Sequence, residues 1–328
     1  MPILRLLILL VFAFTGCYPA GDTGRQNSPC ANTSLNADST ANKYHSGRGA
    51  LLATRFASLE ELKSVIQLEY HPGTSPADSL APENGYVSLR HCSSGREVTG
   101  ILATGISEGD IVKAKREGAF GERFKLLYGS PAAVANRKDL EKIFNLSRLR
   151  FEWFGEGDVA FFEIAESLVA HINTPDLAYL NPRDSSEKGY INSFNHLTAQ
   201  TFVTSCFSEE LADFIGDAHE RYRHPELITG KFTEAQIKDL DEGPVDNYVD
   251  LINNEWGQEL GKQLKAKYGI NQETNWTPEL LANYLNDIAS YYSWAFQIGF
   301  APYRPADEVV RRFSVKINAI MQGHYYYQ

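Results

Sequence analysis

Polar side chains that could do chemistry are concentrated in three otherwise apolar stretches of the second half of the chain. The first stretch, FNHLTAQTF, contains His196, and the second, ADFIGDAHE, contains Asp217 and Glu220. The third, VDNYVDLINNEWG, contains Asp250 and Asn254. Residues three or four positions apart share a helix face, as each of these last two pairs would. We therefore expect three helices that carry polar groups within apolar surroundings.

These side chains could hold one divalent metal ion. Three antiparallel or crossing helices would bring them into one interior site, and helix bundles build metal sites in this way because the ion offsets the cost of burying charge. The predicted ligands are His196, Asp217, Asp250 and Asn254. A bound metal would polarise a substrate oxygen or lower the pKa of a bound water, with Glu220 or Asp217 as the general base.

Two other interpretations of the same residues stay open. Asn, Asp and His in helix-rich folds often satisfy one another and the backbone, which fixes helix register without any chemistry. Carboxylates three or four positions apart are also common on solvated helix faces. The spacing alone does not establish that the three stretches meet.

The same stretches resemble a known family. The order NSFNH, DAHE and DLINN is similar to an uncharacterised bacterial helical domain whose members read approximately NAFRH, DAHE and MDLHNN, and the similarity covers about residues 190–262. The resemblance implies a helical domain whose signature also includes Asn195, His219 and Asn253, and it implies no established activity. Ile252 stands where the family tends to have a histidine, which removes one possible ligand.

Two further motifs do not fit the chemistry that they suggest. GEGDVA, residues 155–160, matches G-x-G-x-x-A, but its acidic residues would oppose a pyrophosphate at the helix N-terminus, and they suit helix capping instead. In HERYRH the two histidines are five residues apart, which places them ~140° apart around a helix, too far for one ion. The sequence contains no G-x-S-x-G elbow and no P-loop.

Apolar spacing predicts a mainly α protein. Helical patterns recur after Phe151, over residues 159–172, 192–206, 208–223, 233–241, 245–267, 277–299 and 305–321. We expect the aromatic run at 291–303 to pack in the core, although glycan or protein recognition is an alternative.

The part of the chain before Phe151 is predicted as a small α+β portion, residues 58–150. Ser58 and Glu61 form a capping-box pattern that predicts a helix to about Tyr70. Alternating residues around a Ser-Ser-Gly turn predict one β-hairpin over about 86–104. The helical domain is expected to occupy residues 151–328.

The N-terminus looks like a bacterial lipoprotein signal. Arg5 precedes an apolar run at 6–14 that is too short to span a bilayer, and FTGC matches a lipobox, with cleavage before Cys17 and lipid attachment to it. Residues 1–16 would be the signal peptide and 17–57 a flexible tether, because 18–57 are polar and lack apolar periodicity. The resemblance implies a lipid-anchored protein of the bacterial cell envelope that faces the periplasm or the exterior.

Composition and cysteine content limit the functional classes. The chain has 328 residues with 31 basic and 41 acidic side chains, a net charge of −10, so we expect no nucleic-acid partner. With Cys17 lipidated, one disulfide is possible, and Cys30 with Cys92 is the favoured pair, whereas Cys206 is expected to be buried. Two hypotheses follow: a binding or structural lipoprotein, or a metal-assisted hydrolase of an envelope glycan, peptide or lipid.

Overall fold

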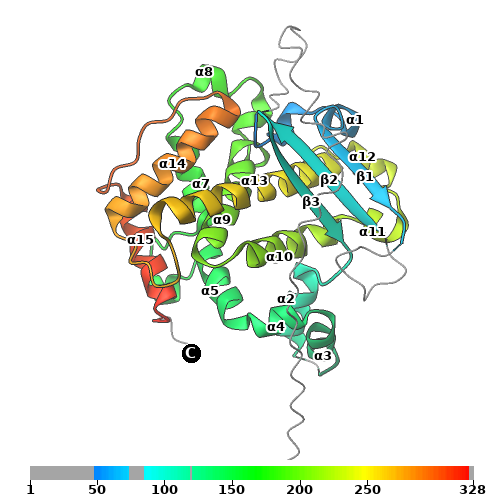
Figure 1. Cartoon of the computed structure of the whole chain (residues 1–328), viewed down its shortest axis with the longest axis horizontal. Helices are drawn as coiled ribbons and strands as arrows, with labels where there is room; N and C mark the ends of the chain where they lie inside the picture. Colours follow the sequence, from blue (N-terminus) through cyan, green and yellow to red (C-terminus); the bar gives the residue numbers. More distant parts are fainter. Residues whose placement is uncertain (1–47, 74–84, 119, 325–328) are drawn as a thin grey trace, which may run out of the picture.

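The structure is a computed structural model that describes residues 48–73, 85–118 and 120–324. In this part of the chain it contains fifteen α-helices and one three-stranded antiparallel sheet, which confirms the predicted fold class (Figure 1). The predicted signal peptide and Cys17 lie outside the described residues. Within the described ranges, no helix has the length and apolar character needed to cross a membrane.

The α-helices are α1 (Leu59–Leu62), α2 (Glu108–Glu117), α3 (Phe120–Gly129), α4 (Pro131–Ala135), α5 (Arg137–Ser147), α6 (Phe151–Phe154), α7 (Phe161–Ala170), α8 (Pro175–Ala178), α9 (Asn192–Cys206), α10 (Glu209–Glu220), α11 (Glu226–Thr229), α12 (Glu234–Lys238), α13 (Pro244–Tyr268), α14 (Pro278–Phe296) and α15 (Glu308–Met321). Shorter helical turns are η3 (Ala53–Arg55), η4 (Pro182–Ser185), η5 (Glu187–Ile191) and η6 (Arg221–Arg223).

The sheet consists of β1 (Ile66–His71), β2 (Tyr86–Ser93) and β3 (Arg96–Ala103) in the order β1-β2-β3. The β2–β3 hairpin confirms the predicted one. The predicted helix to about Tyr70 is wrong, because α1 ends at Leu62 and β1 begins four residues later. The capping box at Ser58 starts only one helical turn, and the following residues instead pair with β2, Ile66 opposite His91.

The long helix α13 connects two hydrophobic clusters. On one side, Val249, Ile252 and Trp256 pack with the sheet and the N-terminal segment. On the other side, α13 packs along α9, which belongs to a larger cluster with α7, α14 and α15 (Figure 1). The predicted boundary between residues 150 and 151 therefore does not separate two independent cores, since sheet residues and α13 share one cluster.

Glycine allows the close approach of α9 and α13. A Cβ atom at Gly257 would lie 2.7 Å from the Leu197 carbonyl oxygen, and one at Gly261 would lie 2.7 Å from that of Thr201. A side chain also joins the two helices directly, because Thr201 Oγ1 donates to the Gly257 carbonyl at 3.1 Å. This contact fixes the two helices that carry most of the polar signature.

The predicted tether is wrong for its last ten residues. Residues 48–56 lie in the body of the protein, where Leu51, Leu52 and Phe56 are each less than 5% exposed. Asn253 donates to the Leu51 carbonyl at 3.0 Å and accepts from the Leu51 N–H at 2.8 Å. The composition of this segment does not predict its burial, because its short apolar run is held by polar groups more than a hundred residues away. The rest of the tether lies outside the described residues.

Other predicted features pack as core or as structural contacts. The aromatic run packs inward as expected, with Tyr292 fully buried and stacked on Phe194 at 4.1 Å between ring centroids. In GEGDVA, Asp158 forms a buried ion pair with Lys316, 3.1 Å apart, which is a structural role. Cys206 is a free, buried thiol, and Cys92 is disulfide-bonded. Cys30, its predicted partner, lies outside the described residues.

Candidate metal centre

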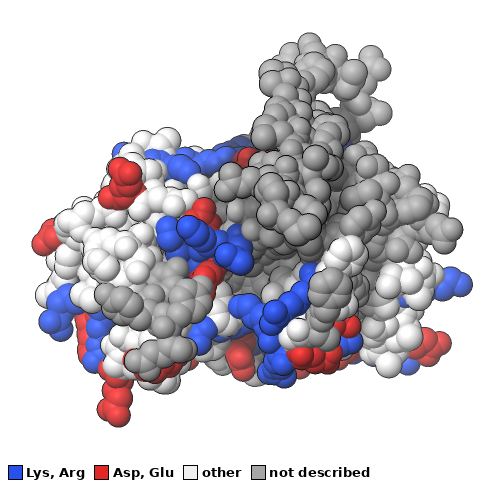
Figure 2. Space-filling model, turned by 90° about the horizontal axis from the view of Figure 1, so that it is seen from below, with Lys and Arg blue, Asp and Glu red and all other residues white. Residues whose placement is uncertain are grey.

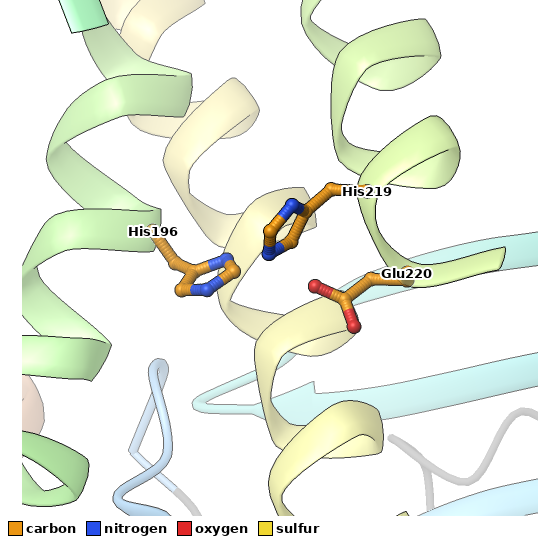
Figure 3. Close-up of side chains that lie close together, drawn as sticks. All are labelled: His196, His219 and Glu220. Carbon is orange, nitrogen blue, oxygen red and sulfur yellow. The ribbon is translucent and has the colours of Figure 1, made fainter. Parts of the chain in front are cut away.

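Helices α9, α10 and α13 bring part of the predicted site together. His196 of α9 projects toward His219 and Glu220 of α10, beside a turn of α13 (Figure 3). One potential ligand atom from each of these three side chains lies within 4.8 Å of the others. The two imidazole rings are 5.8 Å apart between centroids.

His196 is held by two residues of α13. Its Nδ1 lies 3.2 Å from Asn254 Oδ1 and its Nε2 lies 3.3 Å from Asp250 Oδ2. The amide oxygen can only accept, so Nδ1 carries the proton and Nε2 directs a lone pair toward Asp250 Oδ2. Two acceptors at this distance require a proton or a cation between them. Burial lowers the pKa of His196 to about 4, so the ring is neutral at physiological pH. A neutral imidazole with one free nitrogen is the form that binds metals.

His219 has a similar arrangement with a carboxylate. Its Nδ1 lies 2.6 Å from Glu108 Oε2, at the first residue of α2. This hydrogen bond, more than any other contact, lowers the pKa of Glu108. The ring donates to the carboxylate through Nδ1 and so presents Nε2 to its other side. Carboxylate–histidine pairs of this kind orient the histidine ligands of many metal sites.

The carboxyl groups of the cluster are costly to ionise. Glu220 is 1% exposed, and its Oε1 has no hydrogen-bond partner among the residues that the structure describes. Burial, and then the neighbouring Asp250, raises the pKa of Glu220 well above its usual value. Burial likewise raises the pKa of Asp250 to about 7, against the opposing effect of a hydrogen bond from Asn192. A cation between these groups would reverse that cost.

A second layer of polar residues supports Asp250. Asn192, one turn before His196 on α9, donates to Asp250 Oδ1 at 3.1 Å and to Asp246 Oδ1 at 3.2 Å. Lys188 lies 3.5 Å from the other oxygen of Asp246. This layer fixes the orientation of Asp250 relative to His196.

Asp217, predicted as a ligand and as a base, is not part of this group. It pairs with Arg221 at 3.4 Å and lines a hollow of about 460 Å³ between β3, α10 and α13. Burial raises the pKa of Asp217 to about 8 and that of Glu255, which lines the same hollow, to about 9. Asp217 therefore belongs to a separate acidic hollow.

The remaining signature residues have other places. Asn253 binds the N-terminal segment, as described above, and Asn195 lies half-buried on α9. Ile252 is fully buried in the cluster with the sheet, about 200° around α13 from Asp250. A histidine at position 252 would therefore point away from the metal centre, so its loss removes no ligand there.

Sequence reasoning missed several residues of the centre. His219 was assigned only to the signature, although its position beside Glu220 places both at the same end of one helix. Asn192 was detectable, because it is four residues from His196 and so shares its helix face. Glu108 gave no sequence signal, since it is 111 residues from His219 and meets it only through the fold.

Comparison with known proteins gives no relative: no family model, no curated protein and no solved structure matches the chain.

Proposed function

We propose that the helical body binds one divalent first-row metal ion, such as Zn²⁺ or Mn²⁺, through His196, His219 and Glu220, with Asp250 beside them. The convergence of three potential ligand atoms within 4.8 Å carries the proposal. Two imidazoles with one or two carboxylates are a donor set that such ions use in proteins.

The residues around the ligands support the same proposal. Asn254 and Glu108 accept from Nδ1 of the two imidazoles and leave both Nε2 atoms unprotonated, and Asn192 holds Asp250 in place. Glu220 Oε1 has no hydrogen-bond partner in the described part of the chain, and a bound ion would coordinate it. A bound ion supplies Lewis acidity and lowers the pKa of a bound water.

Metal titration of the purified protein tests this proposal. We expect one Zn²⁺ or Mn²⁺ per chain by elemental analysis and calorimetry, with affinity reduced more than about a hundredfold in H196A and E220Q. H171Q is the matched control, because His171 is half-buried and bonds the Ser167 carbonyl at the end of α7. If neither ion raises the melting temperature, or if H171Q weakens binding equally, the cluster is a structural polar network.

A metal-assisted hydrolase is a second candidate, favoured by the exposure of His219. Its side chain is 43% exposed, so solvent and a substrate could approach one side of the ion. In this role Glu220 would move the proton of the attacking water, on an envelope glycan, peptide or lipid. Zn²⁺-loaded protein should then cleave chromogenic ester, peptide or glycoside substrates, and E220Q should abolish turnover even at Zn²⁺ concentrations that saturate the variant. Tight metal binding without turnover would leave a binding role.

The proposed location is the bacterial cell envelope, with the protein anchored through lipid on Cys17. The FTGC motif supports this location, and so does the disulfide at Cys92, because disulfides persist in oxidising compartments. C17S should release the protein from membranes after a high-salt wash, whereas the native chain stays bound. Retention of C17S after that wash would contradict lipidation.

A further inference from the structure

Basic residues are concentrated in one segment of this acidic protein. Residues 108–150 contain ten Lys or Arg and six Asp or Glu, a net charge of +4 in a chain whose total is −10. The segment forms α2 to α5, which lie together at the lower end of the molecule (Figure 1). Viewed from below, basic side chains lie near the centre of this face, with acidic and uncharged side chains beside them (Figure 2).

Exposed apolar side chains lie in the same segment. Six of the thirteen large hydrophobic residues that are exposed in the described part of the chain fall between positions 112 and 151, namely Val112 (37% exposed), Phe124 (54%), Val134 (42%), Phe144 (37%), Leu149 (40%) and Phe151 (51%). Single exposed hydrophobic residues are ordinary, but a group within one basic region indicates an interaction surface.

Cation–π contacts join the basic and apolar groups into one surface. Lys115 of α2 lies 4.6 Å from the ring centroid of Phe144 in α5, and Arg150 lies 4.7 Å from the same centroid. Arg148 also faces that ring, at 5.9 Å. Leu149 and Phe151 flank Arg150 in sequence. We call this set, from α2, α5 and the start of α6, the basic-aromatic face.

Several cations of this region have no internal partner. Arg116, Arg137 and Lys138 are exposed, and none has an acidic group within 4.0 Å among the described residues. Both arginines of the basic-aromatic face are neutralised in part, since Arg148 pairs with Glu108 at 2.9 Å and Arg150 pairs with Glu152 at 3.6 Å. Lys113 likewise pairs with Glu122 at 3.3 Å. The unpaired cations supply attraction for an anionic partner.

We propose that the basic-aromatic face docks on an anionic phospholipid surface. Cations with interspersed aromatic and aliphatic side chains match the interfacial region of a membrane, where headgroup phosphates meet acyl chains. Long Lys and Arg side chains can extend to the phosphates while Leu149 and Phe151 enter the apolar boundary. The net charge of −10 opposes any general attraction to anions, so orientation by this one face is required.

Vesicle flotation of the mature chain, residues 17–328 with Cys17→Ser, tests this proposal without an acyl anchor. We expect binding to vesicles of phosphatidylethanolamine and phosphatidylglycerol, weakened by high salt, and much weaker binding to phosphatidylcholine vesicles. Lys115→Glu with Arg116→Glu should reduce the affinity at least about tenfold, because each basic residue near an anionic surface contributes about a fivefold factor. Phe151→Ser should also reduce it while preserving the salt dependence.

The control is Lys231→Glu with Lys238→Glu, the same charge change at exposed residues before and on α12. An equal loss in this control would overturn the proposal, because net charge rather than the face would then determine binding. Absence of binding to phosphatidylglycerol vesicles, or equal binding to phosphatidylcholine, would also overturn it. Neither result bears on the proposed metal ligands, which lie on α9 and α10, although Glu108 of α2 contacts His219.

Discussion

Replacement of Asn253 by alanine should destabilise the protein strongly, because this side chain holds the N-terminal segment. Its amide makes two hydrogen bonds to Leu51, at 2.8 and 3.0 Å, in a site where Asn253 is fully buried. N253A removes both. The Leu51 carbonyl keeps a hydroxyl donor, Ser193 Oγ, at 3.2 Å, whereas the Leu51 N–H has no replacement.

The size of the effect follows from these contacts. Each lost hydrogen bond costs about 1 kcal/mol, and an orphaned buried N–H costs about 1–3 kcal/mol. Part of these costs overlaps, so we expect the free energy of unfolding to fall by about 2–4 kcal/mol. For a body of this size that corresponds to a decrease in Tm on the order of 4–8 °C.

Urea denaturation and calorimetry measure this change, with Gln263→Ala as the control. Gln263 is an exposed amide on the same helix that bonds the Glu259 carbonyl. Q263A should change stability by less than about 0.5 kcal/mol. N253A should also retain wild-type Zn²⁺ affinity below its melting temperature, because its side chain faces the N-terminal segment. A loss for N253A no larger than that for Q263A would refute the reasoning.

Three further predictions concern buried groups. Burial raises the pKa of Glu226 to about 7, so the stability of the wild-type protein should fall as pH rises from about 4.5 to about 7. E226Q can still accept a hydrogen bond from Tyr248, so pH-dependent melting should show it equal to the wild type near pH 4 and more stable by up to about 3 kcal/mol near pH 8. Cys206, whose pKa burial raises to about 12, should react with thiol reagents only after unfolding. K316M should lose about 3–5 kcal/mol in urea denaturation because it leaves Asp158 buried without a cation, and K316M with D158N should recover part of that loss.

The sequence predicted best the elements whose ends are marked by local chemistry. The predicted helix over 245–267 is observed as Pro244–Tyr268, because a proline begins it and Gly269, in the left-handed conformation with φ 64°, ends it. The strand β1 was missed for the opposite reason. Its formation depends on pairing with β2, whose first residue lies fifteen positions after its last, and no local signal encodes such pairing.

The candidate metal centre was predicted where one helix face carries the pattern and missed where two elements meet. Asp250 and Asn254 are four residues apart on α13 and both face His196, as their spacing indicates. Asp217, three residues before Glu220 on α10, pairs with Arg221 instead. The two carboxylates differ in direction around the helix axis by part of a turn, so Glu220 lies beside His196 whereas Asp217 lines the acidic hollow. Spacing gives the relative direction of side chains on a helix, and only the packing of helices gives the absolute one.

The buried N-terminal segment also has a consequence for the order of folding. Ala50 donates to the Tyr291 hydroxyl across 241 residues, and Leu51 meets Asn253 across 202. During synthesis residue 50 leaves the ribosome long before either partner exists, so this part of the core can close only when the chain is nearly finished. Contacts of such long range slow folding. The N-terminal segment is therefore the part of the core that stays open longest while the chain is synthesised.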